Sequence, residues 1–119
     1  MMEDRIKPLV IRFKDTNEEY ELDFNREAVT FAENRGFELE SVASFPVSKV
    51  PELFYYSFRK NHKKLAKNQT DAILDRIGGL TEKMMERLVL LYNQAIMSNN
   101  VIQDEEDLEK NASVTVEMD

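Results

Sequence analysis

Two short runs near the start of the chain alternate apolar and polar residues, the pattern of strands that bury one face. The apolar side chains are Leu9, Ile11 and Phe13 in the first run and Tyr20, Leu22 and Phe24 in the second. The polar segment 15–19 has the length and composition of a hairpin loop. We expect Arg12 and Lys14 to face Glu21 and Asp23 across this hairpin. Because an isolated hairpin is only marginally stable, helices must cover its apolar face.

The next part of the chain has helical spacing. Asn25 is suited to cap a first helix that runs to Arg35, and Gly36 ends that helix in a left-handed conformation. Residues 37–47 are expected to be irregular. Ser48 is predicted to cap a second helix, with Pro51 in its first turn and an apolar face that continues to Leu65.

Two more helices follow. The third starts at Asn68 or Thr70 and stops at the glycine pair Gly78-Gly79. Thr81 opens the fourth, whose apolar stripe extends through residues 84–96. These patterns predict a single α+β domain over residues 1–100, mainly α, in which the N-terminal β-hairpin packs on about four helices.

The charge of the chain is concentrated at one end. The formal net charge is -7, and residues 104–119 hold seven acids and one lysine, so residues 1–103 are close to neutral. A segment this charged buries too little surface to offset its ordering entropy, so we expect residues 101–119 to form a flexible acidic tail. Apolar and polar residues alternate over 113–118, which allows a short strand there if a sheet edge receives it.

Sequence composition also limits where the protein works. The longest apolar run covers residues 88–92, whereas a membrane-spanning helix needs about 20 residues. The first residues lack the basic and then apolar layout of a secretory signal, and the chain contains no cysteine. We therefore expect a cytoplasmic protein that is not secreted and has no membrane partner.

The residue inventory offers no familiar catalytic arrangement. His62 is the only histidine, so neither a zinc site nor a serine triad can be assembled from the sequence. Gly36, Gly78 and Gly79 do not form a phosphate-binding loop. We therefore expect no enzyme activity, no catalytic residue, no cofactor and no metal, and a role in binding another protein.

Three groups of residues are candidates for that binding. A basic cluster around residues 59–67 suits a solvated helix face, the docking of a partner or of the acidic tail, or contact with nucleic acid, although the near-neutral body disfavours the last. Two tyrosines precede the cluster. The methionines of the last helix fill the core or form an adaptable docking surface. The candidate partner-binding residues are Tyr55, Tyr56, Arg59, Lys60, Lys63, Lys64, Met84, Met85, Tyr92 and Met97.

Nearly the whole chain resembles the small tail assembly chaperones of long-tailed bacteriophages, particularly those of phages and prophages of low-GC Gram-positive bacteria. The similar stretches are the hairpin 9–24, the segments 25–37, 50–58 and 62–64, Ala72-Ile73-Leu74-Asp75, and the acidic stretch that leads into residues 110–116. The resemblance implies a non-enzymatic protein that binds the tape-measure protein and tail-tube subunits, so that they do not aggregate or polymerise early.

Two points stay open at the level of sequence. The chain could form a homo-oligomer, and a longer frameshifted form is often made in the resembling family. The alternative function is a small nucleic-acid-binding protein that uses a basic helix around residues 59–67, including Lys67.

Overall fold

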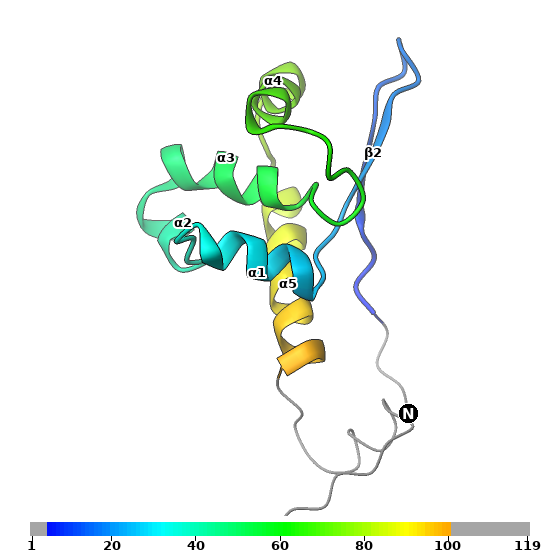
Figure 1. Cartoon of the computed structure of the whole chain (residues 1–119). Helices are drawn as coiled ribbons and strands as arrows, with labels where there is room; N and C mark the ends of the chain where they lie inside the picture. The colour runs from blue at the N-terminus through cyan, green and yellow to red at the C-terminus, as the bar shows by residue number, and fades with distance from the viewer. Residues whose placement is uncertain (1–4, 101–119) are drawn as a thin grey trace, which may run out of the picture.

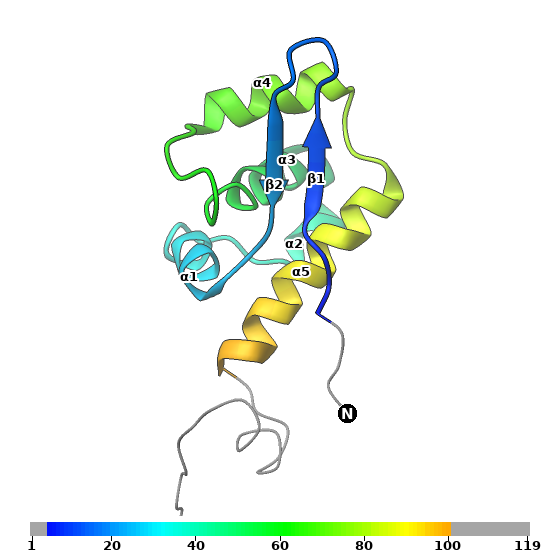
Figure 2. The same cartoon turned by 90° about the vertical axis from the view of Figure 1, so that its right-hand side faces the viewer.

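The computed structural model describes residues 5–100, and Figures 1 and 2 show their arrangement in two views. Its elements are β1 (Leu9–Arg12), β2 (Glu19–Leu22), α1 (Arg26–Asn34), α2 (Ser41–Ser44), α3 (Pro46–Tyr56), α4 (Lys67–Ile77) and α5 (Glu82–Asn100). The predicted α+β class, mainly α with an N-terminal hairpin, is confirmed. The described residues contain five helices, because α2 adds one short helix to the predicted four. The predicted flexible tail and the strand at 113–118 lie outside the described residues.

The hairpin is antiparallel, with Leu9 opposite Leu22 and Ile11 opposite Tyr20. Ile11 and Leu22 are buried, so the predicted apolar face is the one that covers the core. The hairpin loop is closed at Phe13 and Glu18, where the Phe13 amide donates to the Glu18 carbonyl at 2.8 Å.

This register makes the predicted cross-strand charge pairs wrong. Arg12 lies opposite Glu19 and forms an ion pair with it at 2.8 Å, whereas Glu21 lies opposite Val10. Asp23 is buried rather than solvent-facing, and its carboxylate binds Lys60. The length of the closed loop decides which residues face each other, and the alternating pattern does not contain that information.

The boundaries of α1 agree with the predicted caps. The Asn25 side chain accepts a hydrogen bond from the Ala28 amide at 2.8 Å. At the other end Gly36 has a φ of +83°, and the Phe37 amide donates to the Ala32 carbonyl at 3.1 Å. This is the pairing of a Schellman ending, and it directs the buried Phe37 ring back towards the helix.

The second predicted helix differs at both ends. It begins at Pro46 and not at Ser48, since Pro46 is suited to the first helical position and the preceding segment folds into α2. Pro51 therefore lies inside α3 instead of in its first turn. The helix ends at Tyr56, where the buried Ser57 hydroxyl donates to the Phe54 carbonyl at 2.6 Å.

The basic residues after α3 consequently lie in turns up to α4. The Ser57 carbonyl is fixed by the Asp23 amide at 3.0 Å, which ties the end of α3 to the segment after β2. No continuous basic helix runs through 59–67, because the chain must bend here to meet the hairpin.

The last two helices follow the predicted signals closely. Helix α4 starts at Lys67 and stops at Gly78, where the Gly79 amide donates to the Leu74 carbonyl at 3.0 Å. Both glycines have positive φ, as such an ending requires. The Thr81 hydroxyl accepts from the Met84 amide at 3.1 Å and so caps α5.

A single hydrophobic core connects the hairpin with the helices. In Figure 1 α5 runs through the centre, with α1 and α3 beside it and the hairpin along another side. The largest fully buried side chains come from the hairpin, α3, the turn after α3 and α5: Leu22, Leu53, Phe54, Phe58, Leu88 and Leu91. Within residues 5–100 no helix is long and apolar enough to cross a membrane.

Candidate protein-binding surface

The predicted aromatic anchors are mostly core residues. Tyr56 and Tyr92 are 4% and 3% exposed, so neither ring projects freely from the surface, although Tyr92 lines the hollow described below. Tyr55 is half-buried, and its ring lies 6.1 Å from that of Phe31 on α1. Tyr56 and Tyr92 lie on the apolar sides of their helices, and the packing of α1 against α3 and α5 covers both rings.

The predicted methionines fall into two classes. Met84 and Met85 are half-buried and pack against the core cluster, as the core-filling alternative requires. Met97 is 41% exposed and is accessible to a partner. The other exposed large apolar side chains among the described residues are Val10, Phe45, Val47 and Leu90.

The basic cluster is largely neutralised by acids of the same fold. Arg59 and Lys63 both bind Glu27, at 3.1 and 3.7 Å, and Lys60 binds the buried Asp23 at 2.7 Å. The Arg59 guanidinium also lies 4.0 Å from the centre of the Phe31 ring.

The two remaining lysines of the cluster differ from each other. Lys67 binds Asp71 at 3.1 Å, and Lys64 forms no ion pair with any described residue. The paired cations already have carboxylate partners within the fold, which reduces the unpaired positive charge that this surface presents.

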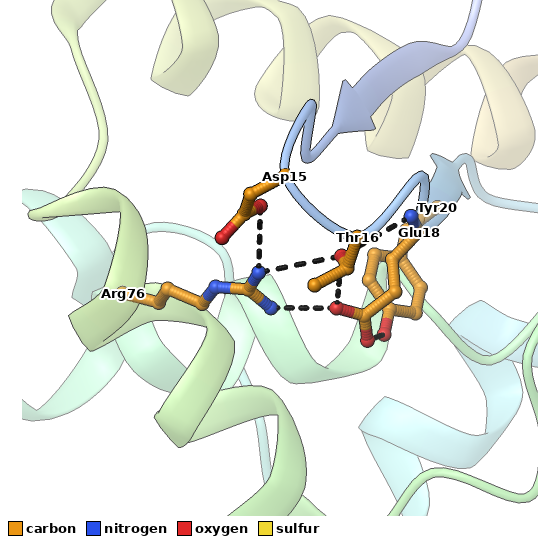
Figure 3. Close-up of polar contacts among 5 residues, drawn as sticks. All are labelled: Asp15, Thr16, Glu18, Tyr20 and Arg76. Carbon is orange, nitrogen blue, oxygen red and sulfur yellow. Dashed lines mark hydrogen bonds and ion pairs between the residues drawn. The ribbon is translucent and has the colours of Figure 1, made fainter.

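A polar cluster fixes the hairpin loop to α4 (Figure 3). The Arg76 guanidinium donates to Glu18 at 2.7 Å and to Asp15 at 3.1 Å, and it lies 3.7 Å from the centre of the Phe13 ring. The Arg76 contact, followed by hydrogen bonds from Thr16 and Tyr20, lowers the pKa of Glu18 to about 2. These groups already satisfy one another, so the cluster serves to hold the loop in place.

A hollow of about 350 Å³ lies where the turn after α1 meets α5. Its apolar lining comes from Phe37 and Leu39 on the turn and from Tyr92 and Ile96 on α5, one helical turn apart. The remaining lining residues are Glu33, Gly36, Glu38, Glu40 and Asn93. The three glutamates are exposed, so the hollow has an acidic rim and most of its accessible lining is polar around a small apolar floor.

The electrostatics of the hollow affect Tyr92. Burial, followed by the nearby charges of Glu33 and Glu40, raises the pKa of Tyr92 to about 12. The shift leaves the phenol neutral at physiological pH, as an ordinary tyrosine is. None of the three rim glutamates forms an ion pair with a described residue, so the rim carries negative charge. Such a hollow suits an apolar side chain flanked by lysine or arginine, as on one face of an amphipathic helix.

Within residues 5–97, whose side chains the structure places, no three histidine or carboxylate side chains gather closely enough to hold a metal ion. His62 accepts a hydrogen bond from the Glu21 amide at 3.0 Å and so supports the edge of β2.

The chain was also compared with known proteins. Residues 2–118 match a protein family that is described as a domain of unknown function, DUF5055. The chain belongs to the DUF5055 family. No curated protein and no solved structure matches it.

For this DUF5055 protein, the candidates predicted from the sequence include Tyr92, which lines the hollow, and the exposed Met97, but not the three glutamates of the rim. Glu33 lies in the last turn of α1, and Glu38 and Glu40 follow Gly36, so their clustering depends on the turn at Gly36. One signal was present in the sequence: Glu38 and Glu40 alternate with Phe37 and Leu39 directly after the predicted end of a helix.

Proposed function

We propose that this DUF5055 protein is a non-enzymatic tail assembly chaperone of a long-tailed bacteriophage. It acts in the host cytoplasm, where it binds the tape-measure protein, the tail-tube protein or both, and prevents their early aggregation or polymerisation. The identity of these clients is supported by the resemblance along the chain to the tail assembly chaperones.

The acidic hollow is the observation that most supports protein binding. An apolar side chain of the client enters between Leu39 and Ile96, while flanking lysines or arginines meet Glu38 and Glu40. Desolvated contacts of this kind supply most of the affinity of small interfaces, and the rim charges favour basic over acidic clients.

Co-expression with the neighbouring tape-measure protein, followed by pull-down, tests the proposal. We expect a complex with the native chain, at least tenfold weaker binding with Glu38→Lys/Glu40→Lys, and little change with Glu82→Lys/Glu86→Lys. The control pair changes the net charge equally on an exposed part of α5 outside the hollow.

A second assay measures chaperone action directly. Light scattering of the tail-tube protein should rise more slowly with an equimolar amount of the native chain than with the Glu38→Lys/Glu40→Lys variant. The absence of any complex with either cognate protein would overturn the proposal. Equal binding by both double variants would exclude the hollow as its site.

A further inference from the structure

Among residues 5–100, nothing pairs with the outer edge of β1. In an antiparallel pair, residues alternate between directing both backbone groups at the partner strand and directing both away from it. Because the Phe13 amide donates to the Glu18 carbonyl, the odd-numbered residues of β1 direct their backbone N–H and C=O groups towards β2. Val10 and Arg12 therefore direct their N–H and C=O groups outward, where no described residue bonds them.

On the opposite edge of the hairpin, side chains form hydrogen bonds with the outward-facing backbone groups of β2. The Glu21 amide donates to His62 Nε2 at 3.0 Å, and Asn61 Nδ2 donates to the Glu21 carbonyl at 3.2 Å. Proteins usually cover or pair exposed strand edges, because such edges otherwise recruit further strands. Protection of β2 but not of β1 indicates that β1 is the receiving edge.

An exposed apolar strip on α5 lies beside this edge. Arg87 donates to the Lys7 carbonyl at 3.2 Å, and Gln94 accepts from the Ile6 amide at 2.7 Å, so this face of α5 adjoins the start of β1. Leu90 and Met97 share the face by helical spacing and are 43% and 41% exposed. Figure 2 shows α5 running obliquely behind β1, with its N-terminal half on the outer side of β1, so a strand added to β1 would lie over part of this helix.

The charge of β1 selects the kind of strand that fits. Residues 5–14 contain four cations and no acid: Arg5, Lys7, Arg12 and Lys14. Pairing β1 with β1 of a second copy would place like charges together, which is destabilising. An acidic strand has the opposite effect.

The chain itself contains such a segment. Residues 113–118 contain the acid Glu117 and no cation, and one side of their period-two pattern is apolar. Most of the other acids of the tail lie in residues 104–109, within the connection to this segment. We propose that residues 113–118 of the same molecule add to the open edge of β1 as a third strand. Val114, Val116 and Met118 then face α5, and Glu117 lies on the side of Arg12.

The connection is long enough for this pairing. Gln94 adjoins Ile6, and Asn100 lies six residues further along α5, which is about 9 Å of helix. Leu9 lies three residues beyond Ile6, or about 10 Å along the chain. The twelve residues 101–112 can span about 40 Å, roughly twice the sum of these distances.

Amide hydrogen exchange on the full-length chain tests the proposal. The Val10 and Arg12 amides should exchange at least tenfold more slowly in the native chain than in Thr115→Pro/Val116→Pro. Only every second residue of the added strand would donate its N–H to β1, so replacing two adjacent residues by proline removes one of these donors whichever set faces β1. The control Asn111→Pro/Ala112→Pro, outside the strand, should retain the protection. Equal exchange of Val10 and Arg12 in the native and Thr115→Pro/Val116→Pro chains would overturn the proposal.

A spin label separates pairing within one molecule from pairing between copies. The chain has no cysteine, so a label on Glu117→Cys is unique. It should broaden the resonances of Val10 and Arg12 in the same molecule but not those of Ala43 on α2, which packs on α3 on the side away from the hairpin. Broadening of an unlabelled, isotope-enriched chain mixed with the labelled one would overturn the intramolecular strand in favour of exchange between copies.

Discussion

At the scale of single residues, the most consequential polar contact is the ion pair between Lys60 and Asp23. Asp23 is 6% exposed, and its carboxylate also accepts a hydrogen bond from the Phe24 amide at 2.8 Å. Lys60 keeps its ammonium partly in water, with 31% of its side chain exposed. The contact ties the turn after α3 to the end of the hairpin, so its loss affects two segments at once.

Lys60→Met should lower the free energy of unfolding by about 1–3 kcal/mol, because it leaves a buried carboxylate without its cation. The value stays below that of a fully buried pair because Lys60 is partly solvated. Urea denaturation measures the change. Lys63→Met, which removes an exposed pair, should shift stability by less than about 0.5 kcal/mol. A loss of the same size in both variants would contradict this account.

The Glu18 cluster predicts a pH dependence. Because the folded pKa of Glu18 is about 2 and its ordinary value is 4.5, its contribution to stability is complete above pH 4.5 and disappears as the pH falls towards 2. A carbon-detected NMR titration should return the low pKa in the native chain. Arg76→Gln should raise it more than Tyr20→Phe, since the Arg76 contact is the largest cause. The reverse order would be inconsistent with Arg76 as the principal partner.

At the scale of elements, the helix ends are the most locally determined parts of the fold. Asn25, Gly36, Gly78 and Thr81 each act at a terminus through backbone conformation or a short hydrogen bond. None of these signals needs a distant partner. The end of α3 is different, because the carbonyl of Ser57 is held by an amide from the end of the hairpin.

Gly36→Ala should destabilise the protein by about 1 kcal/mol, because alanine resists a φ of +83°. A Cβ at this position would meet no atom within 4 Å, so the cost is backbone strain and not a clash. Gly36→Asn should cost less, since asparagine tolerates the left-handed region. Thermal denaturation of the three chains compares them; equal stability of the alanine variant and the native chain would refute the strain argument.

At the scale of the whole molecule, hairpin and helices share one core. Leu22 is fully buried among helix side chains, and the Phe24 and Tyr92 rings lie 5.0 Å apart. The two-stranded sheet therefore gains its stability from α5 and its neighbours, and the helices use the hairpin to cover apolar surface. The hairpin should not unfold separately.

Leu22→Ala should cost about 2–5 kcal/mol and lower the melting temperature of the helices together with that of the hairpin. Far-ultraviolet circular dichroism follows the helices, and near-ultraviolet circular dichroism follows the aromatic packing. Val10→Ala, on the opposite face and 47% exposed, should leave both transitions within a few degrees of native. Two separate transitions in Leu22→Ala would show that hairpin and helices form independent units.

How well each part of this fold can be predicted from the sequence depends on how far apart in the sequence the interacting residues lie. Alternation identified the hairpin, and helical spacing identified the faces of α1, α4 and α5, because both periods are properties of the local backbone. The basic cluster was interpreted as part of a helix because the apolar spacing continues past Ser57. The actual bend is imposed by contacts of Ser57, Asn61 and His62 with the hairpin.

The sequence by itself determined the class of the fold, the helix ends at Asn25, Gly36, Gly78 and Thr81, and the alternation that gives the hairpin a buried face, since these depend on neighbours within one or two turns. Tertiary structure decided what each surface offers. It buried Tyr56 and Tyr92, paired the basic cluster with Asp23 and Glu27, and gathered the glutamates around the hollow. Within residues 5–100 it also left the outer edge of β1 without a backbone partner. Those outcomes depend on which elements meet, and a one-dimensional pattern does not record which distant residues will share a space.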